Sequence, residues 1–186
     1  MTSLIKTSYT HPIRIDTVRA DSAPGYIGMT FCPGKKLANA YSGGDWDRDL
    51  DKDLDAIVEA GASMLITLIE GHEFEEMKVT SLPQKAEAHG LKWVHLPIRD
   101  KGIPDAAFED AWDKVGDDLH QHLLEGETIV IHCKGGLGRT GVIAARLLIG
   151  LGEEATTSIE KVRSARPGTI ETQAQEAYVL HLKCLE

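Results

Sequence analysis

Two hydrophobic periods alternate along the chain. Short apolar and β-branched runs, of up to about eight residues, are typical of strands, and apolar positions three or four residues apart are typical of amphipathic helices. The first pattern predicts strands at 13–15, 26–31, 63–69, 91–98 and 128–131. The second predicts helices near 46–58, 73–77, 82–89, 106–123, 142–149, 153–166 and 169–182.

The order of these elements predicts one α/β domain with a mainly parallel central sheet flanked by helices, because strands alternate with helices over most of the chain. The 186 residues, 42% of them hydrophobic, suffice for a sizeable core. We therefore expect a single domain over 1–186. Residues 1–12 are polar and are expected to be mobile.

Six aspartates alternate with other residues between 45 and 55. A calcium loop is excluded, since every register lacks the glycine and the bidentate glutamate that such a loop requires. Trp46, Leu50, Leu54, Ile57 and Val58 instead form an apolar stripe, which predicts a surface helix with its carboxylates in solvent.

Composition narrows the functional classes. A net charge of −9 argues against a nucleic-acid surface. Cys32, Cys133 and Cys184 are odd in number and scattered, which suits a reducing compartment, and none has a partner at zinc-ligand spacing. Without a signal-peptide pattern or a long apolar run, the expected location is the cytoplasm, with no membrane span.

The most informative stretch is 132–141, which reads His-Cys-Lys-Gly-Gly-Leu-Gly-Arg-Thr-Gly. It lies between a predicted strand and a predicted helix and is therefore a strand-to-helix turn. Such a turn presents backbone N–H groups at a helix N-terminus, and these bind a tetrahedral oxyanion without a metal. A nucleotide-binding loop fits less well, since it would end in Gly-Lys-Ser/Thr.

Three side chains add chemistry to this turn. Cys133 is a candidate nucleophile, because the amides and the helix dipole favour a thiolate. Arg139 has a planar fork that can hold two phosphoryl oxygens. Thr140 is expected within reach of the sulfur, where its hydroxyl would stabilise the thiolate as it leaves. His132 is expected to fix the loop by hydrogen bonds.

The 132–141 string resembles the Cys-x5-Arg signature of the protein tyrosine phosphatase superfamily. The resemblance implies the α/β phosphatase fold and catalysis through a phosphocysteine, with no metal and no cofactor. It also implies that the substrate phosphate is bound by the turn, at Lys134, Gly135, Gly136, Leu137, Gly138 and Arg139.

A second loop, 97–105, follows a predicted strand and holds two candidate acids. Its Pro-Ile-x-Asp segment is similar to the kinase-associated branch of small dual-specificity phosphatases, and this resemblance places the general acid at Asp100. Asp105 immediately precedes a helical stripe and is interpreted as the N-terminal cap of that helix. Asp105 remains the alternative acid.

The segment 169–175 resembles the family's glutamine loop, in which glutamines position the hydrolytic water. Gln175 matches the second glutamine, whereas Glu171 stands where the first often lies. An acidic helix start explains the same residues equally well. Earlier in the chain, Lys35 and Lys36 are interpreted as part of a solvated turn, with the alternative that they border an anionic substrate.

The expected activity is that of a phosphoprotein phosphatase acting on phosphotyrosine and on phosphoserine or phosphothreonine, with a phosphorylated protein as the partner. Two alternatives stay open. Lys134 follows the nucleophile, as in some phosphoinositide phosphatases, and so allows an inositol lipid or another small phosphate ester. A phosphopeptide-binding domain without catalysis would keep the same cradle.

Overall fold

The computed structural model describes residues 5–38 and 43–182. Residues 1–4 of the segment expected to be mobile, and Cys184, lie outside the described residues. Within 7–11, the carbonyls of Thr7 and His11 accept hydrogen bonds from Arg48 at 3.3 and 2.7 Å. Over the described ranges, no helix is long and apolar enough to cross a bilayer.

The molecule is built on a five-stranded sheet of order β2-β3-β8-β6-β7. All neighbouring strands are parallel except β2 and β3. This confirms the predicted α/β class with a mainly parallel sheet. A second sheet, of order β1-β5-β4, is small. The strands are β1 Ile5–Lys6, β2 Asp16–Val18, β3 Tyr26–Thr30, β4 Lys36–Leu37, β5 Asp45–Asp47, β6 Ala62–Thr67, β7 Lys92–His95 and β8 Thr128–His132.

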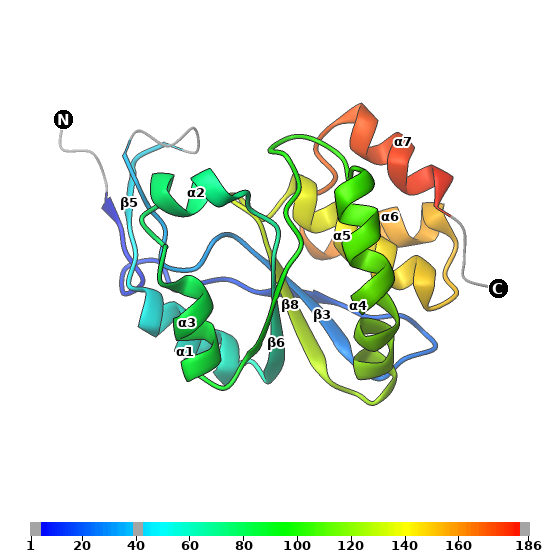
Figure 1. Cartoon of the computed structure of the whole chain (residues 1–186), viewed down its shortest axis with the longest axis horizontal. Coiled ribbons are helices and arrows are strands. Elements are labelled where there is room, and N and C mark those ends of the chain that lie inside the picture. Colours follow the sequence, from blue (N-terminus) through cyan, green and yellow to red (C-terminus); the bar gives the residue numbers. More distant parts are fainter. Residues whose placement is uncertain (1–4, 39–42, 183–186) are drawn as a thin grey trace.

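Helices cover both faces of the large sheet. In Figure 1, α1 and α3 lie on one side of it, and α4 to α7 lie on the other. The short α2 lies near the carboxyl ends of the parallel strands, beyond β6. The helices are α1 Leu50–Glu59, α2 Gly71–Glu76, α3 Leu82–Ala88, α4 Ala106–Leu124, α5 Gly138–Gly150, α6 Ala155–Ala165 and α7 Gln173–His181.

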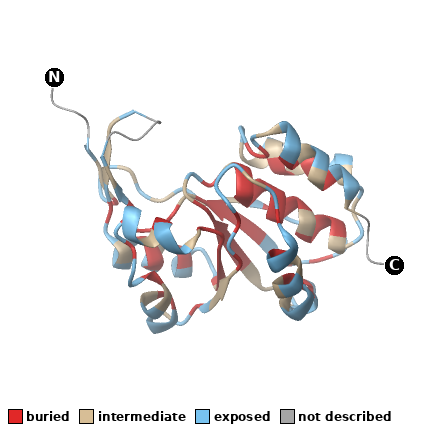
Figure 2. Ribbon diagram, turned by 45° about the horizontal axis from the view of Figure 1, so that its top comes forward, coloured by how far each residue is buried: buried red, intermediate tan, exposed pale blue. Residues whose placement is uncertain are grey.

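The central strand β8 shows why both faces need cover. Ile129 and Ile131 belong to the core beneath α4 and α5, whereas Val130 belongs to the smaller cluster beneath α1 and α3. Side chains alternate between the faces of a strand, so an all-apolar strand buries both. Figure 2 shows the sheet and α5 largely in the colour of buried residues. The motif turn therefore rests on a rigid base.

Two predicted elements are wrong near the N-terminus. The strand expected at 13–15 begins instead at Asp16, where pairing with Met29 of β3 sets the register. The helix expected from Trp46 begins at Leu50, because Asp49 caps it by accepting a hydrogen bond from the Lys52 amide. Trp46 itself lies in β5. A short stripe at helical spacing thus spans a strand, a cap and a helix.

One aspartate of α1 is buried, contrary to the expectation that these carboxylates face solvent. Asp53 is 1% exposed and forms a bidentate pair with the fully buried Arg48, each contact 2.8 Å long. Asp53 also accepts a hydrogen bond from the Gly34 amide at 2.9 Å. The pair ties α1 to the turn after β3.

Replacing Asp53 by Asn should destabilise the protein by about 3–5 kcal/mol, because it leaves a buried guanidinium without a counter-charge. Urea unfolding would measure the change. Asp55→Asn is the control on the same helix, since Asp55 is 64% exposed. Its effect should stay within about 0.5 kcal/mol. Equal effects of the two substitutions would contradict the structural role of the pair.

Candidate active site

The turn that joins β8 to α5 packs closely against its neighbours. Gly136 has a φ of +72°, and a Cβ there would lie 2.3 Å from the carbonyl oxygen of Thr30 in β3. A Cβ on Gly138 would lie 2.9 Å from the Gln175 side chain. Only glycine fits where a backbone approaches this closely with positive φ. Gly136 is thus required by the shape of the turn, and a side chain at position 138 would displace Gln175.

Cys133 lies at the start of this turn and is 3% exposed. Its sulfur accepts a hydrogen bond from the Gly136 amide at 3.2 Å. Such a bond stabilises negative charge on sulfur. The sulfur is therefore held by the backbone of the loop that it begins.

Cys133 lines a cavity of about 290 Å³. The predicted phosphate-binding residues Lys134, Gly135, Leu137, Gly138 and Arg139 also line it, whereas Gly136 contributes through its contact with the sulfur. The remaining lining residues come from other parts of the chain: Lys35, Leu37, Asp100, Lys101 and Glu171.

Arg139 is held by a residue that the sequence did not reveal. Its two terminal nitrogens donate to the two oxygens of Glu73, at 2.7 and 2.9 Å. Nη1 also donates to the Ile98 carbonyl at 3.0 Å. Both side chains of the pair are 2% exposed. The guanidinium plane is therefore fixed from α2 and from the loop after β7.

The charges of this pair support each other. Burial disfavours the charged guanidinium, but the hydrogen bonds and charge of Glu73 outweigh it and raise the pKa of Arg139. Burial likewise favours neutral Glu73, yet hydrogen bonds from Arg139 and from the Glu70 amide hold its pKa below the usual value. Both groups are therefore ionised at neutral pH.

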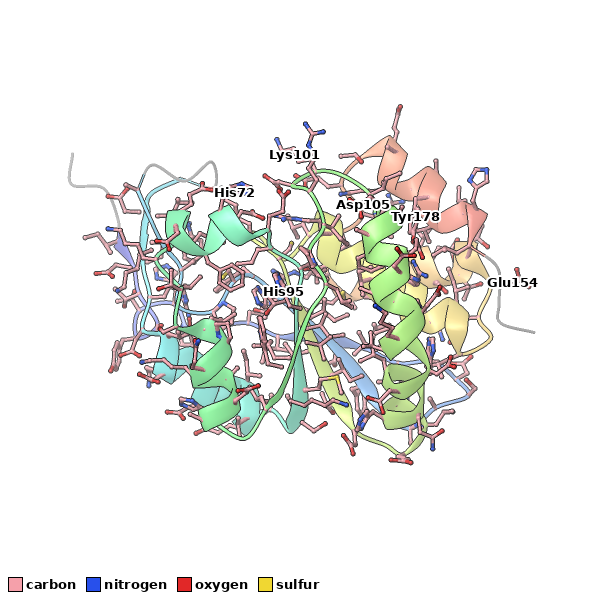
Figure 3. The ribbon with its side chains drawn as sticks, viewed as in Figure 1. His72, His95, Lys101, Asp105, Glu154 and Tyr178 are labelled. Atoms are coloured by element: carbon pink, nitrogen blue, oxygen red, sulfur yellow. The ribbon has the colours of Figure 1, made fainter. Side chains whose placement is uncertain are left out.

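The structure separates the two candidate acids. Asp100 accepts a hydrogen bond from Arg139 Nη2 at 3.0 Å, and its side chain is 50% exposed at the cavity. Asp105 caps α4 by accepting from the Phe108 amide at 2.9 Å. Figure 3 shows Asp105 at the beginning of α4, while Lys101 projects from the loop that carries Asp100. The capping interpretation of Asp105 is confirmed.

His132 is fully buried between β8 and its neighbours. Nε2 lies 2.8 Å from the Thr67 hydroxyl, which also accepts from the Trp93 indole at 2.9 Å. Nδ1 lies 3.1 Å from the Cys133 carbonyl. Burial lowers the pKa of His132 to about 4. A neutral imidazole thus bridges β6 to the backbone of the nucleophile.

Thr140 does not make the contact expected of it. Within the described residues, its buried hydroxyl has no hydrogen-bond partner, so it makes no hydrogen bond to the Cys133 sulfur. Helix α5 begins at Gly138, so Thr140 lies in its first turn and does not line the cavity. The hydroxyl is placed by the helix rather than by the loop.

Gln175 is buried and fully engaged in its own surroundings. Its Oε1 accepts from the amides of Glu171 and Thr172, at 2.9 and 3.2 Å, as part of the cap of α7. Its Nε2 donates to the carbonyl of Gly102 at 3.0 Å. Gln175 therefore ties the acid-bearing loop to α7. Glu171 lines the cavity instead.

Arg166 supports the turn from outside the cavity and was also missed from sequence. Its Nε donates to the Gly136 carbonyl at 2.7 Å, and Nη2 lies 3.4 Å from the Gly135 carbonyl. Asp16 of β2 binds the same guanidinium at 2.8 Å. Arginine donating to loop carbonyls leaves the opposite, amide side of the peptide units available to an anion.

A group of possible metal ligands lies elsewhere. Ligand atoms of His122, Glu125 and Glu127 lie within 4.8 Å of one another. They flank the amino end of β8, opposite to Cys133, and His122 is hydrogen-bonded to Glu127 at 2.8 Å. The group has no connection with the motif turn.

Comparison with known proteins agrees with this geometry. A family model described as "Swiss Army Knife protein, DSP-PTPase phosphatase domain" matches residues 44–179, which include the motif turn and the loop of Asp100. The chain belongs to this family. It is a dual-specificity phosphatase domain of the protein tyrosine phosphatase type.

Individual relatives of this phosphatase domain support the same family assignment. It is 28% identical over 157 residues to cyclin-dependent kinase inhibitor 3 of Rattus norvegicus, covering 83% of this chain and 70% of the relative. PRL-1 phosphatase of Drosophila melanogaster is 33% identical over 84 residues, 45% of this chain and 47% of that protein.

A solved structure extends the likeness to the whole fold. The crystal structure of kinase associated phosphatase, with a serine in place of its catalytic-site cysteine, superimposes with a TM-score of 0.77 at 26% identity. The match covers 90% of this chain and 92% of that one. The expected similarity to kinase-associated phosphatases is confirmed.

The buried His132 of this phosphatase domain should make stability fall with acidity. Its pKa is about 4 in the folded protein, below the value of about 6.5 in an unfolded chain. As the pH falls from 6.5 to 4, the unfolded state gains a proton that the folded state does not, which costs roughly 3 kcal/mol. Below pH 4 both states are protonated, and the loss is complete.

Urea unfolding of wild type and His132→Gln across pH 4–7 would test this. The free energy of unfolding of the wild type should fall relative to that of the variant as the pH decreases, since the other groups are common to both. Parallel curves would show that His132 does not carry the effect.

Proposed function

We propose that the protein is a cysteine-dependent phosphatase that hydrolyses phosphate monoesters of proteins, at phosphotyrosine and at phosphoserine or phosphothreonine. One observation carries this proposal. Cys133, Arg139 and Asp100 line the same cavity. The Cys133 sulfur accepts a hydrogen bond from the Gly136 amide, and an Asp100 carboxylate oxygen lies 3.0 Å from Nη2 of Arg139. A nucleophile, an oxyanion clamp and a proton donor therefore share one small space.

In the first step, the Cys133 thiolate attacks phosphorus in line with the leaving oxygen. Arg139 and the amides of 134–139 hold the equatorial oxygens, where fixed donors need no reorganisation as charge moves. Asp100 gives its proton to the leaving oxygen. The S–P bond forms as the P–O bond breaks, and the products are phosphocysteine and the free hydroxyl.

In the second step, the Asp100 carboxylate takes a proton from water as that water attacks phosphorus. The S–P bond breaks, and the thiolate and inorganic phosphate are released. Gln175 keeps the loop of Asp100 in place through the Gly102 carbonyl, so its role is to position the acid. Glu171 lines the cavity, so we assign the contact with the hydrolytic water to Glu171 rather than to Gln175.

The contact between Arg139 and Asp100 implies a change when substrate binds. Phosphate oxygens compete for the same Nη2 that Asp100 occupies. We infer that Asp100 leaves Arg139 and turns to the leaving oxygen, while Glu73 keeps the guanidinium plane in place. The half-exposed loop position of Asp100 permits this exchange.

The proposed partner is a phosphorylated protein. The relatives reported above as cyclin-dependent kinase inhibitor 3 and kinase associated phosphatase support this class of substrate. A nucleophilic thiol acts only while reduced, and Cys32 and Cys133 are free, so the cytoplasm is the proposed location.

The activity is tested with p-nitrophenyl phosphate in reducing, chelated buffer. Turnover is expected, with inhibition by vanadate, and Cys133→Ser should abolish it because serine has no comparable anion at neutral pH. Cys32→Ser is a matched control that removes the other described thiol and should keep turnover. Folded wild-type protein that binds phosphopeptides without releasing phosphate would contradict the proposal and favour a binding domain.

The general acid is tested by comparing Asp100→Asn with Asp105→Asn. On a phosphoserine peptide, Asp100→Asn should lower kcat by roughly 10²–10⁴-fold, because an alkoxide leaves poorly without a proton. The loss should be smaller with p-nitrophenyl phosphate, and the alkaline limb of the kcat profile should disappear. Asp105→Asn should change neither kcat nor thermal stability appreciably, because asparagine caps a helix as well as aspartate does. A large loss of kcat in Asp105→Asn, with normal kcat in Asp100→Asn, would assign the acid to Asp105.

A further inference from the structure

A buried lysine from outside the motif lines the cavity of Cys133. Lys35 follows β3 in the chain, is 5% exposed, and was interpreted from sequence as part of a solvated turn. That interpretation is wrong. The Nζ atom donates to the Lys134 carbonyl at 3.2 Å and lies 4.0 Å from the ring centroid of Trp46 and 4.7 Å from that of Phe31.

The position of Lys35 follows from the register of the sheet. Thr30 of β3, His132 of β8 and Thr67 of β6 are paired in line, so the segments after these strands emerge side by side. The amide of Cys32 donates to the Lys134 carbonyl at 3.3 Å, the same carbonyl that binds Lys35. The lysine is thus fixed against the phosphate-binding turn.

Lys35 differs from the nearby cations in its ion pairing. Arg139 is paired with Glu73, Lys134 with Glu76 and Arg48 with Asp53. For Lys35, no carboxylate of the described residues lies within 4.0 Å of Nζ. Aromatic faces attract an ammonium but do not neutralise it. A buried cation that no carboxylate pairs is costly, and an anionic ligand would offset that cost.

The groups that face Lys35 leave it charged near neutrality. Burial is the main cause that lowers the pKa of Lys35, to about 8. The charges of Arg48 and Lys6 also lower it, whereas those of Cys32 and Cys133 raise it. The ammonium therefore predominates at pH 7 and is lost above pH 8.

We propose that Lys35 forms a second anion-binding subsite beside the Cys133 turn, which selects phosphate monoesters that carry another phosphate on the same small ring. This inference rests on the cysteine chemistry of the proposed function and adds a second substrate class, beside phosphorylated proteins, for the same site. The chemistry is that of a vicinal inositol bisphosphate, whether free or as a lipid headgroup. The phosphate on Cys133 is the one transferred, with Asp100 protonating the ring oxygen.

The location of Lys35 favours, as the ligand of the second subsite, a compact ring over a doubly phosphorylated peptide. A group that contacts Lys35 must enter the same cavity of about 290 Å³ that receives the reacting phosphate. In an extended peptide, neighbouring side chains point to opposite faces, so a second phosphorylated residue would stay at the rim. Vicinal phosphates on one ring enter together.

The first experiment compares kcat/KM for a vicinal inositol bisphosphate with that for the matching inositol monophosphate. Lys35→Met should reduce the ratio of the two values by roughly tenfold to a hundredfold, the usual effect of one charged hydrogen bond. Lys36→Met is the matched control, because Lys36 is exposed and paired with Asp47. Its ratio should equal that of the wild type.

Wild-type protein provides a test that needs no substitution. The ratio of bisphosphate to monophosphate kcat/KM should fall as the pH rises through about 8, and this fall should be absent in Lys35→Met. Binding of the bisphosphate to Cys133→Ser, measured by calorimetry, should weaken equally when Lys35→Met is added. This readout does not depend on turnover.

The outcomes separate the possible explanations. If Lys35→Met lowers the ratio with the free bisphosphate, the ligand of the subsite is a soluble inositol phosphate. If it lowers the ratio only with phosphatidylcholine vesicles that carry the bisphosphate lipid, the ligand is the lipid headgroup. Either result supports the subsite. An unchanged ratio with active enzyme overturns it, as does a larger loss on a doubly phosphorylated peptide. Absence of all turnover by wild type, with intact bisphosphate binding, would instead refute the proposed function.

Discussion

The site depends on the pair formed by Arg139 and Glu73. A guanidinium that is 2% exposed needs a counter-charge, and Glu73 supplies both oxygens in the fork geometry that arginine prefers. Because Glu73 comes from α2 and the third contact comes from the Ile98 carbonyl, the orientation of Arg139 is set by two segments beyond the turn. The clamp is therefore oriented before any ligand arrives.

The same arrangement holds for the backbone of the turn. Arg166 binds the carbonyl side of its peptide units, His132 bridges its first residue to β6, and Gly136 packs on the Thr30 carbonyl. Each contact comes from a different part of the fold. Fixed donors stabilise a developing charge better than mobile ones, because they need not reorient. The surrounding structure therefore holds this turn rigid.

Sequence alone could predict what is local. The turn, its strand and its helix are contiguous, so the spacing of Cys133 and Arg139 contained the essential geometry, and the capping role of Asp105 follows from the residues after it. Glu73 and Lys35 could not be found in this way, since Glu73 is brought to Arg139, and Lys35 to the cavity, only through the arrangement of β3, β6 and β8. The expected contact between Thr140 and the Cys133 sulfur is absent, because Thr140 lies in the first turn of α5 and the helix sets the orientation of its side chain.

The place of β8 at the middle of the sheet also bears on how the chain folds. It separates β2 and β3 from β6 and β7, although it is the last strand in sequence. During synthesis the two halves of the sheet have no shared partner until residues 128–132 leave the ribosome. Such non-local parallel pairing is slow and leaves unpaired edges exposed to aggregation. The nascent chain must therefore keep β3 and β6 from pairing elsewhere until residues 128–132 have emerged.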